Sequence, residues 1–306
     1  MSRHARIPAI SLLVLLFSAA YAQTSAPSQP QPAPRRFLMW KAVSPTSTLY
    51  LVGSIHVGDK TMYPLPPEVE SAFAAARVLT VEININTVDK MKATQLILKN
   101  GTYSGGDSLS KHISKETSDA LDDFCSKHGL PRAGLEQFRP WLAAVTIAGL
   151  SWKEAGEDPA LGIDQHFLDE SKPPQRIDEL ETMESQLNLF IDSSEEEQQS
   201  FLTATLKQRD RMKDMVKQIQ AAYVSGDAGA LDKILKEQSD TGSKTLTRKW
   251  LYDRNMTMAS RLEDYLKSRE GAFVVVGAGH LVGEKGIPSL LREKGYKVEQ
   301  VILETK

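Results

Sequence analysis

Two histidines occur in the same short motif, one near each end of the chain. Residues 53–56 read Gly-Ser-Ile-His and residues 277–280 read Gly-Ala-Gly-His, and each follows an apolar run typical of a buried strand. One GxxH motif carries little information, but two in the same setting are unlikely to be accidental. The glycine allows a sharp turn or a close backbone approach. The histidine is then placed beyond the carboxyl end of a strand, where open sheets bind ligands.

A carboxylate occurs in a comparable setting. Glu82 stands in the otherwise apolar stretch 78–83, and an isolated buried carboxylate costs several kcal/mol in lost hydration. If this strand neighbours the other two, Glu82 meets His56 and His280 at one edge of a sheet. Two imidazoles and a carboxylate with open positions suit a hydrolytic divalent-metal site. The alternatives are a salt bridge for Glu82 and a hydrogen-bonded core position for either histidine.

A guanidinium group is predicted to point into the protein. Arg254 lies four residues from both Trp250 and Met258, so it shares their apolar face of a helix. A buried guanidinium needs an anion, which could be Glu82, a substrate carboxylate or a developing oxyanion. A purely structural ion pair is the competing interpretation.

Asp164 follows the same logic, because Leu161 and Leu168 flank it at helical spacing. We consider it a candidate neighbour of the metal ligands, with His166 as a further candidate. Asp59, just after the first motif, is better explained as a turn residue.

These residues must be positioned by elements at both ends of the chain. The patterns predict a β-hairpin, a helix starting at the Pro66-Pro67 pair and a strand, and later a strand, a helix and a last strand. The predicted hairpin covers 37–42 and 49–55, the helix about 66–76 and the following strand 78–83. Near the C-terminus the predicted strand covers 272–276, the helix 286–294 and the last strand 297–303. The chain between about 87 and 270 is predicted to be mostly helical, with one helix over 193–225 and another over 244–271. The sequence therefore predicts an α/β (α+β) fold. Its central sheet is formed from N- and C-terminal strand-GxxH-helix-strand units with a large helical insertion.

Composition excludes several classes of protein. The 306 residues are 41% hydrophobic and 25% charged, which is unlike a disordered, collagen-like or polytopic membrane protein. A net charge of -2 gives no reason to expect nucleic acid as a partner. A single cysteine excludes an intrachain disulfide and a cysteine-based zinc cluster.

The first 22 residues have the pattern of a signal peptide. Arg3 and Arg6 precede the apolar stretch 7–20, and Ala20-Tyr21-Ala22 supplies a small-x-small cleavage site. Cleavage after Ala22 predicts an exported protein, periplasmic or secreted, without a stable membrane anchor. An uncleaved amphipathic anchor is the alternative. Residues 23–36 are rich in Pro, Ser and Gln and predict a linker, which leaves 37–306 as the folded domain.

At these residues the sequence resembles the TraB/GumN family, which includes the animal Tiki proteases and is distantly akin to erythromycin-esterase-like and ChaN-like proteins. The resemblance runs from about residue 49 to the C-terminus. It rests on LYLVGSIHVG (49–58), VEI (81–83), PWLAA (140–144), LGIDQHF (161–167), ELETMESQL (179–187), RNMTMA (254–259) and FVVVGAGHLVGEKG (273–286).

The resemblance implies a reaction centre formed by His56, Glu82 and His280, with Arg254 as the matching arginine. In the Tiki branch this centre is similar to a metalloprotease that uses manganese or cobalt, whereas ChaN-like proteins bind haem. We therefore predict a divalent-metal-dependent hydrolase of the Tiki-like peptidase type that acts on a peptide or protein, with manganese or cobalt favoured over zinc by the resemblance. The alternatives are a non-catalytic exported haem- or metal-binding protein and an envelope or exopolysaccharide assembly factor. Serine catalysis is disfavoured because no GxSxG motif is present.

Overall fold

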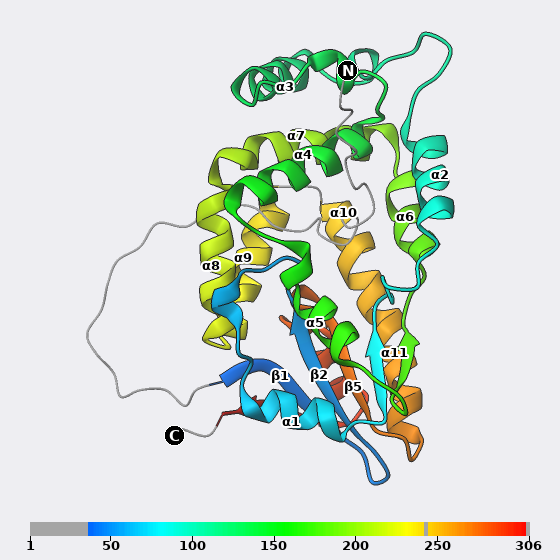
Figure 1. The fold of residues 1–306 in the computed structure, drawn as a ribbon, viewed down its shortest axis with the longest axis vertical. Helices are drawn as coiled ribbons and strands as arrows, with labels where there is room; N and C mark the ends of the chain where they lie inside the picture. Colours follow the sequence, from blue (N-terminus) through cyan, green and yellow to red (C-terminus); the bar gives the residue numbers. More distant parts are fainter. Residues whose placement is uncertain (1–35, 242–243, 304–306) are drawn as a thin grey trace, which may run out of the picture.

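The computed structural model describes residues 36–241 and 244–303. The predicted signal peptide and nearly all of the predicted linker lie outside these residues. Figure 1 shows two regions along the long axis of the molecule: a sheet with its covering helices at one end, and a helical region at the other. Within the described part of the chain, no helix is long and apolar enough to cross a membrane.

The sheet has six strands, in the order β4-β3-β5-β2-β1-β6. Strands β2, β3, β4 and β5 are mutually parallel, and β1 runs antiparallel to both β2 and β6. The predicted α+β class and the predicted hairpin, β1 with β2, are thus confirmed. The strands are β1 (Arg36–Val43), β2 (Thr48–Ser54), β3 (Val78–Val81), β4 (Arg176–Glu179), β5 (Ala272–Gly277) and β6 (Lys297–Ile302).

The two GxxH units interleave in this sheet. β2 and β5 are direct neighbours, with Gly53 opposite Val276. From β2 the chain passes through α1 (Pro67–Ala75) to β3, on the far side of β5. From β5 it passes through α12 (Ile287–Glu293) to β6, beyond β2 and β1. The connections leave in opposite directions, so the carboxyl ends of β2 and β5 form a switch point of the kind where open sheets bind ligands.

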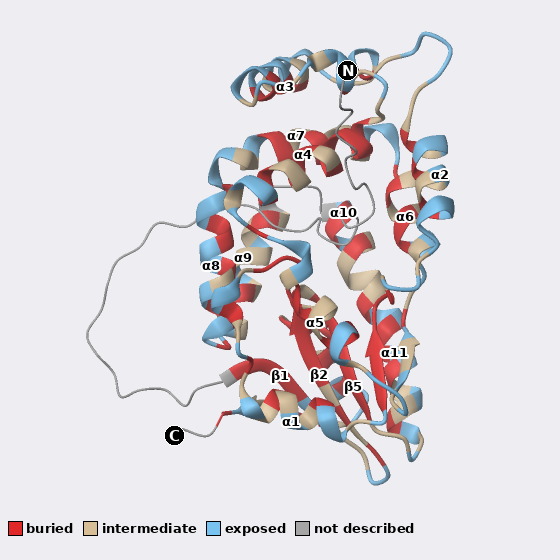
Figure 2. Ribbon diagram, in the orientation of Figure 1, coloured by how far each residue is buried: buried red, intermediate tan, exposed pale blue. Residues whose placement is uncertain are grey.

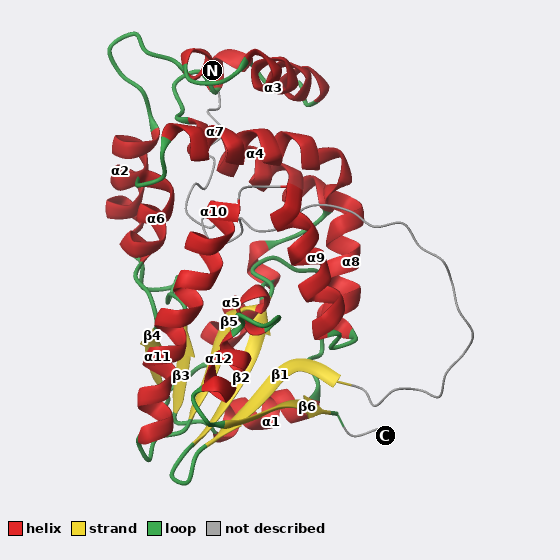
Figure 3. Ribbon diagram, turned by 180° about the vertical axis from the view of Figure 1, so that it is seen from behind, coloured by secondary structure: helices red, strands yellow, loops and turns green. Residues whose placement is uncertain are grey.

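Helices cover both faces of the sheet. α1 and α5 (Ile163–Glu170) lie on one face in Figure 1, and α11 (Asp253–Lys267) and α12 lie on the other in Figure 3. On the first face the ring of Phe167 packs between Phe73 and Phe273, with centroid distances of 4.9 and 4.8 Å. Strands buried on both faces read as continuous apolar runs, and Figure 2 shows the central strands as almost wholly buried.

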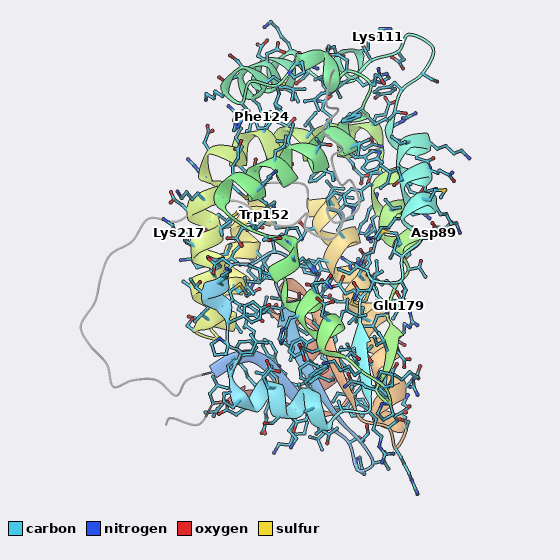
Figure 4. All side chains as sticks on the ribbon, viewed as in Figure 1. Asp89, Lys111, Phe124, Trp152, Glu179 and Lys217 are labelled. Carbon is cyan, nitrogen blue, oxygen red and sulfur yellow. The ribbon has the colours of Figure 1, made fainter. Side chains whose placement is uncertain are left out.

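The helical insertion carries a second hydrophobic core. One cluster of buried side chains surrounds the sheet and includes Trp152, whereas the other lies among the helices and includes Phe124; both side chains are labelled in Figure 4. α4 contributes to both clusters. The helices of this region are α2 (Lys90–Gly101), α3 (Lys115–Lys127), α4 (Pro140–Ala155), α6 (Met183–Ile191), α7 (Glu195–Gln208), α8 (Met212–Val224), α9 (Ala228–Thr241) and α10 (Lys244–Thr247).

The insertion differs from the prediction in two places. The helix expected over 193–225 is divided into α7 and α8 by a 3-10 turn at Arg209–Arg211. Leu202 of α7 packs in the helical cluster, and Tyr223 of α8 packs in the sheet cluster. The helical insertion also contains the strand β4, whose four residues Arg-Ile-Asp-Glu have no apolar pattern that could have predicted a strand.

Candidate metal centre

The motif residues lie at the carboxyl edge of the sheet, at the switch point. His56 comes two residues after β2, and Glu82 directly follows β3. His280 lies in a 3-10 helix, Ala278–Leu281, that begins directly after β5. The start of α5 docks on the first motif, where the Ile163 N–H donates to the carbonyl of Ile55 at 3.0 Å.

Three of the predicted residues surround one small space beside Gly277. A methyl group added to this glycine would lie 3.2 Å from Glu82 Oε1, 3.3 Å from His56 Nε2 and 3.4 Å from His280 Cδ2. Side chains from the ends of three different strands therefore converge on the same point. Gly277 keeps the point free because it has no side chain of its own.

The imidazole of His56 is backed by a carboxylate. Its Nδ1 lies 3.1 Å from Asp164 Oδ1, although the two are not aligned as a regular hydrogen bond. The Ser54 hydroxyl donates to the same oxygen at 2.7 Å. Burial lowers the pKa of His56, but the Asp164 carboxylate more than offsets this, and the pKa is raised above 6.5. Asp164 thus orients the ring so that Nε2 faces the shared point.

The imidazole of His280 is backed by an amide. Its Nδ1 is hydrogen-bonded to Asn255 Oδ1, and only 5% of the residue is exposed. Burial, assisted by the positive charge of Arg254, lowers the pKa of His280 to about 3. His280 is therefore neutral at physiological pH, with Nε2 3.6 Å from Glu82 Oε1.

Glu82 accepts hydrogen bonds on both carboxylate oxygens. Oε1 accepts from the Gly277 N–H at 2.6 Å, and Oε2 accepts from Arg254 at 2.7 Å and Gln186 at 3.0 Å. Burial opposes ionisation, but His280, Arg254 and the Gly277 N–H hold the pKa of Glu82 at about 2. Because His280 is itself neutral at pH 7, Arg254 and Gly277 stabilise the anion there. A carboxylate of such low pKa is a poor general base.

Arg254 points inward, as its helical spacing indicates, and its donors are engaged by the protein. Nε and Nη2 donate to the two oxygens of Glu181 at 2.8 and 2.6 Å, and Nη2 also reaches Glu82. Nη1 donates to the carbonyl of Trp250 at 3.0 Å. Of the roles considered for Arg254, the geometry favours anchoring Glu82 over contacting an oxyanion.

The structure does not bring every candidate together. His166 lies 3.2 Å from Glu70 of α1 and packs on the ring of Tyr63, in the loop before α1, rather than facing the shared point. Asp59 caps the 3-10 helix Lys60–Met62 by accepting from the N–H of Thr61 at 2.6 Å. This is the turn role expected for it.

Three contributing residues were missed from the sequence. Gln186 and Asn255 are 2% and 1% exposed, and Glu181 receives the guanidinium of Arg254. Gln186 has apolar neighbours at positions i-3 and i+4, Met183 and Phe190, which is the pattern that identified Asp164. Asn255 has them at i-4 and i+3. Glu181 follows β4 in a loop, where no periodicity could identify it.

The donor types and the charge of the site fit a divalent cation. The site holds three carboxylates, of which Glu82 and Glu181 pair with Arg254 and Asp164 pairs with His56, so the formal charge is -2 when both imidazoles are neutral. Both imidazoles use Nδ1 for an orienting partner, the arrangement usual for metal-binding histidines. As the described side chains stand, no three His, Cys, Asp or Glu residues are arranged to hold an ion. The fit therefore rests on chemistry and orientation and not on coordination distances.

Comparison with known proteins places the chain among uncharacterised relatives. The model of the TraB/PrgY/gumN family matches residues 38–300. The uncharacterized protein YbaP of Escherichia coli K12 is 25% identical over 244 residues, which is 79% of this chain and 87% of YbaP. An uncharacterized protein of Treponema pallidum is 22% identical over 269 residues, covering 84% of this chain and 80% of that protein. No solved structure was found to match.

Proposed function

The chain belongs to the TraB/PrgY/gumN family, and we propose that it is a divalent-metal-dependent hydrolase that cleaves peptides or proteins. The observation that carries the proposal is the convergence of His56 Nε2, Glu82 Oε1 and the His280 ring on one point beside Gly277. The formal charge of -2 around that point supports it, since a divalent ion would neutralise it. The surroundings are ionic and not apolar, which favours hydrolysis over the haem-binding alternative.

In the proposed mechanism His56, His280 and Glu82 hold the ion. A divalent ion there would supply a Lewis acid to polarise a scissile carbonyl and would make a water more acidic. Asp164 and Asn255 orient the two imidazoles, and Arg254 holds Glu82 in its ionised form. Glu82 serves as a ligand in this proposal, because Oε1 faces the shared point while Arg254 and Gln186 hold Oε2.

Metal content and cleavage test the proposal together. The mature protein is stripped with chelator, reloaded with Mn²⁺, Co²⁺ or Zn²⁺, and assayed against a peptide library. We expect metal-stimulated cleavage that His56→Ala and His280→Ala each abolish. His128→Ala is the matched control, because His128 also pairs with a carboxylate, Glu154 at 2.7 Å, but lies outside the site. Wild-type protein that binds no divalent ion and cleaves no peptide would refute the proposal, and a Soret band on adding haem would then favour haem binding.

Glu82→Gln separates the two roles considered for the glutamate. As a ligand, Glu82 should be needed for metal binding, so the variant should lose the ion as well as activity. Retained metal with lost turnover would identify Glu82 as the general base instead.

Metal binding should also weaken in acid. A histidine must be neutral to bind a metal, and the pKa of His56 is raised above 6.5 by Asp164. We therefore expect an acid limb in the pH profile of metal affinity, with loss as the pH falls through the pKa of His56. His280 should not contribute to this limb above pH 5, because its pKa is about 3.

We further propose that the protein is exported and matures by cleavage after Ala22. The support is the order of positive charge, apolar run and Ala-Tyr-Ala in residues 3–22. Protein isolated from its native compartment should begin at Gln23 on N-terminal sequencing. Recovery of a mature soluble protein that still carries residues 1–22 would contradict export by this route.

A further inference from the structure

Asn255 bridges the second GxxH motif and the loop that follows it. Its Oδ1 is hydrogen-bonded to His280 Nδ1, and its Nδ2 donates to the carbonyl of Lys285 at 2.8 Å. The residue is 1% exposed, so water does not replace either partner. The Lys285 carbonyl can only accept a hydrogen bond, and this fixes which end of the amide faces the histidine.

The fixed amide determines where the proton of the imidazole lies. Because Asn255 presents its oxygen to His280, Nδ1 must carry the hydrogen, and Nε2 is left with its lone pair. The opposite tautomer would set an imidazole lone pair against the amide oxygen. It would also point Nε2–H at Glu82 Oε1 from 3.6 Å, which is too far for a regular hydrogen bond. The Asn255 side of the ring therefore fixes the tautomer, because no regular hydrogen bond from Nε2 to Glu82 opposes it.

The same helix turn also fixes the glutamate of the site. Arg254, the preceding residue of α11, holds Glu82, while Asn255 holds His280. Adjacent helical residues point about 100° apart, so they reach two different strands of the sheet. A five-residue π-helical turn, Arg248–Tyr252, ends two residues before Arg254.

We propose that Asn255 is a positioning residue that locks His280 in the Nδ1–H tautomer and thereby keeps Nε2 available to a ligand at the shared point. The functional consequence, tighter divalent-metal binding, rests on the proposed function. The tautomer lock itself does not, since it is a property of the metal-free protein.

The test compares three variants in chelator and then in Mn²⁺. Asn255→Asp keeps an acceptor at the same place, Asn255→Leu removes it with little change in volume, and Asn188→Leu makes the same substitution at a half-buried helical asparagine outside the site. Ring ¹⁵N NMR of metal-free protein reports the tautomer of His280. We expect Nδ1–H in the wild type and in Asn255→Asp, and a mixed or reversed tautomer in Asn255→Leu.

Mn²⁺ titration then measures the consequence. Loss of an outer hydrogen bond to a metal-binding histidine typically weakens affinity about 10–100-fold, and we expect this for Asn255→Leu. Asn255→Asp should bind Mn²⁺ at least as tightly as the wild type does. Asn188→Leu should bind Mn²⁺ with the same affinity as the wild type. An Nε2–H tautomer in the wild type, or an unchanged tautomer in Asn255→Leu, would overturn the proposal. If Asn255→Leu does not fold, the His280 tautomer is compared between the wild type and Asn255→Ala, and the same outcomes support or overturn the proposal. A wild type with the expected tautomer that binds no Mn²⁺ would refute the proposed function and leave the lock standing.

Discussion

The two GxxH motifs look equivalent in sequence and are not equivalent in the protein. Each places a histidine beyond one of two neighbouring parallel strands, and both rings reach the point beside Gly277. His56 is backed by the carboxylate of Asp164, which raises its pKa above 6.5 against the effect of burial. His280 is backed by a neutral amide and lies close to Arg254, and its pKa falls to about 3.

The difference shows that the partners of a motif decide its chemistry. His280 is neutral at every physiological pH, whereas the pKa of His56 is raised above 6.5 by Asp164. The partner of His56 comes from α5, whereas α11 provides a partner for both His280 and Glu82. The helical elements thus do more than cover the sheet, because they assign different protonation states to two similar residues.

Removing Arg254 should have the largest effect and should make the two histidines more alike. Arg254→Met leaves Glu82 and Glu181 buried without their cation, and breaking such a pair typically costs about 3–5 kcal/mol. The pKa of His280 should also rise, since the charge of Arg254 helps to lower it. Urea unfolding in chelator measures the loss. Arg248→Met is the control, because its ion pair is exposed and surface pairs contribute about 0–1 kcal/mol. Equal stability of the two variants would contradict the buried network.

The motif glycines should separate stability from ligand binding. A methyl on Gly53 would lie 3.0 Å from Ala278 Cβ and 3.1 Å from its Cα, so Gly53→Ala forces the two motifs apart. Overpacking of this kind typically costs about 1–3 kcal/mol. Gly277→Ala instead meets only side-chain atoms at 3.2–3.4 Å, and should change stability less while filling the space proposed for the ion.

Thermal unfolding and Mn²⁺ titration of both variants check this contrast. Gly279→Ala is the control, because its added methyl would make only ordinary contacts, the nearest at 3.4 Å to Leu235. Full Mn²⁺ affinity in Gly277→Ala would show that the point beside Gly277 is not where the ion binds.

The two histidines should give opposite pH dependences of stability in chelator. The pKa of His280 in the folded protein, about 3, is below its unfolded value of 6.5, so its contribution is present above pH 6.5 and is lost as the pH falls toward 3. The pKa of His56 is raised, so its contribution is present below pH 6.5 and is lost as the pH rises through the folded value. One such proton changes the free energy of unfolding by about 1.4 kcal/mol per pH unit at most.

Urea unfolding between pH 5 and 7.5 separates the two contributions. His280→Asn should reduce the loss of stability as the pH falls from 6.5 to 5, and His56→Asn should reduce the loss as the pH rises from 6.5 to 7.5. Glu82 adds an acid loss only below its unfolded pKa of 4.5, because its folded pKa is about 2. Variants with the same slope would contradict the difference between the two motifs.

Much of this arrangement could be predicted from the sequence, because the strands of the sheet are buried on both faces and read as apolar runs. A histidine or glutamate at the end of such a run is conspicuous, and this is how His56, Glu82 and His280 were identified. Helical periodicity located Arg254. Asn255 and Gln186 show the same pattern, because each has apolar residues at helical spacing on both sides.

The remaining features depend on contacts between distant segments. Glu181 follows a four-residue edge strand without an apolar pattern, so only the pairing of β4 with β3 brings it to the site. The turn at Arg209–Arg211 separates two helices that pack on different hydrophobic clusters, and helical periodicity alone does not distinguish the clusters. His166 lies on the same helix as Asp164 but faces Glu70.

The smallest expected change in stability comes from neutralising the carboxylate behind His56. Asp164→Asn keeps an oxygen that can accept from the Ser54 hydroxyl, so the local hydrogen bonding can persist. Without the negative charge, burial becomes the dominant influence on His56, and its pKa should fall from above 6.5 to below it. Both motif histidines would then be neutral at pH 7, and the difference between them would largely disappear. NMR titration of the metal-free protein follows the His56 ring directly, with Asp169→Asn, an exposed position on the same helix, as the control. A pKa of His56 that stays above 6.5 in Asp164→Asn would show that a group other than Asp164 makes the two motifs different.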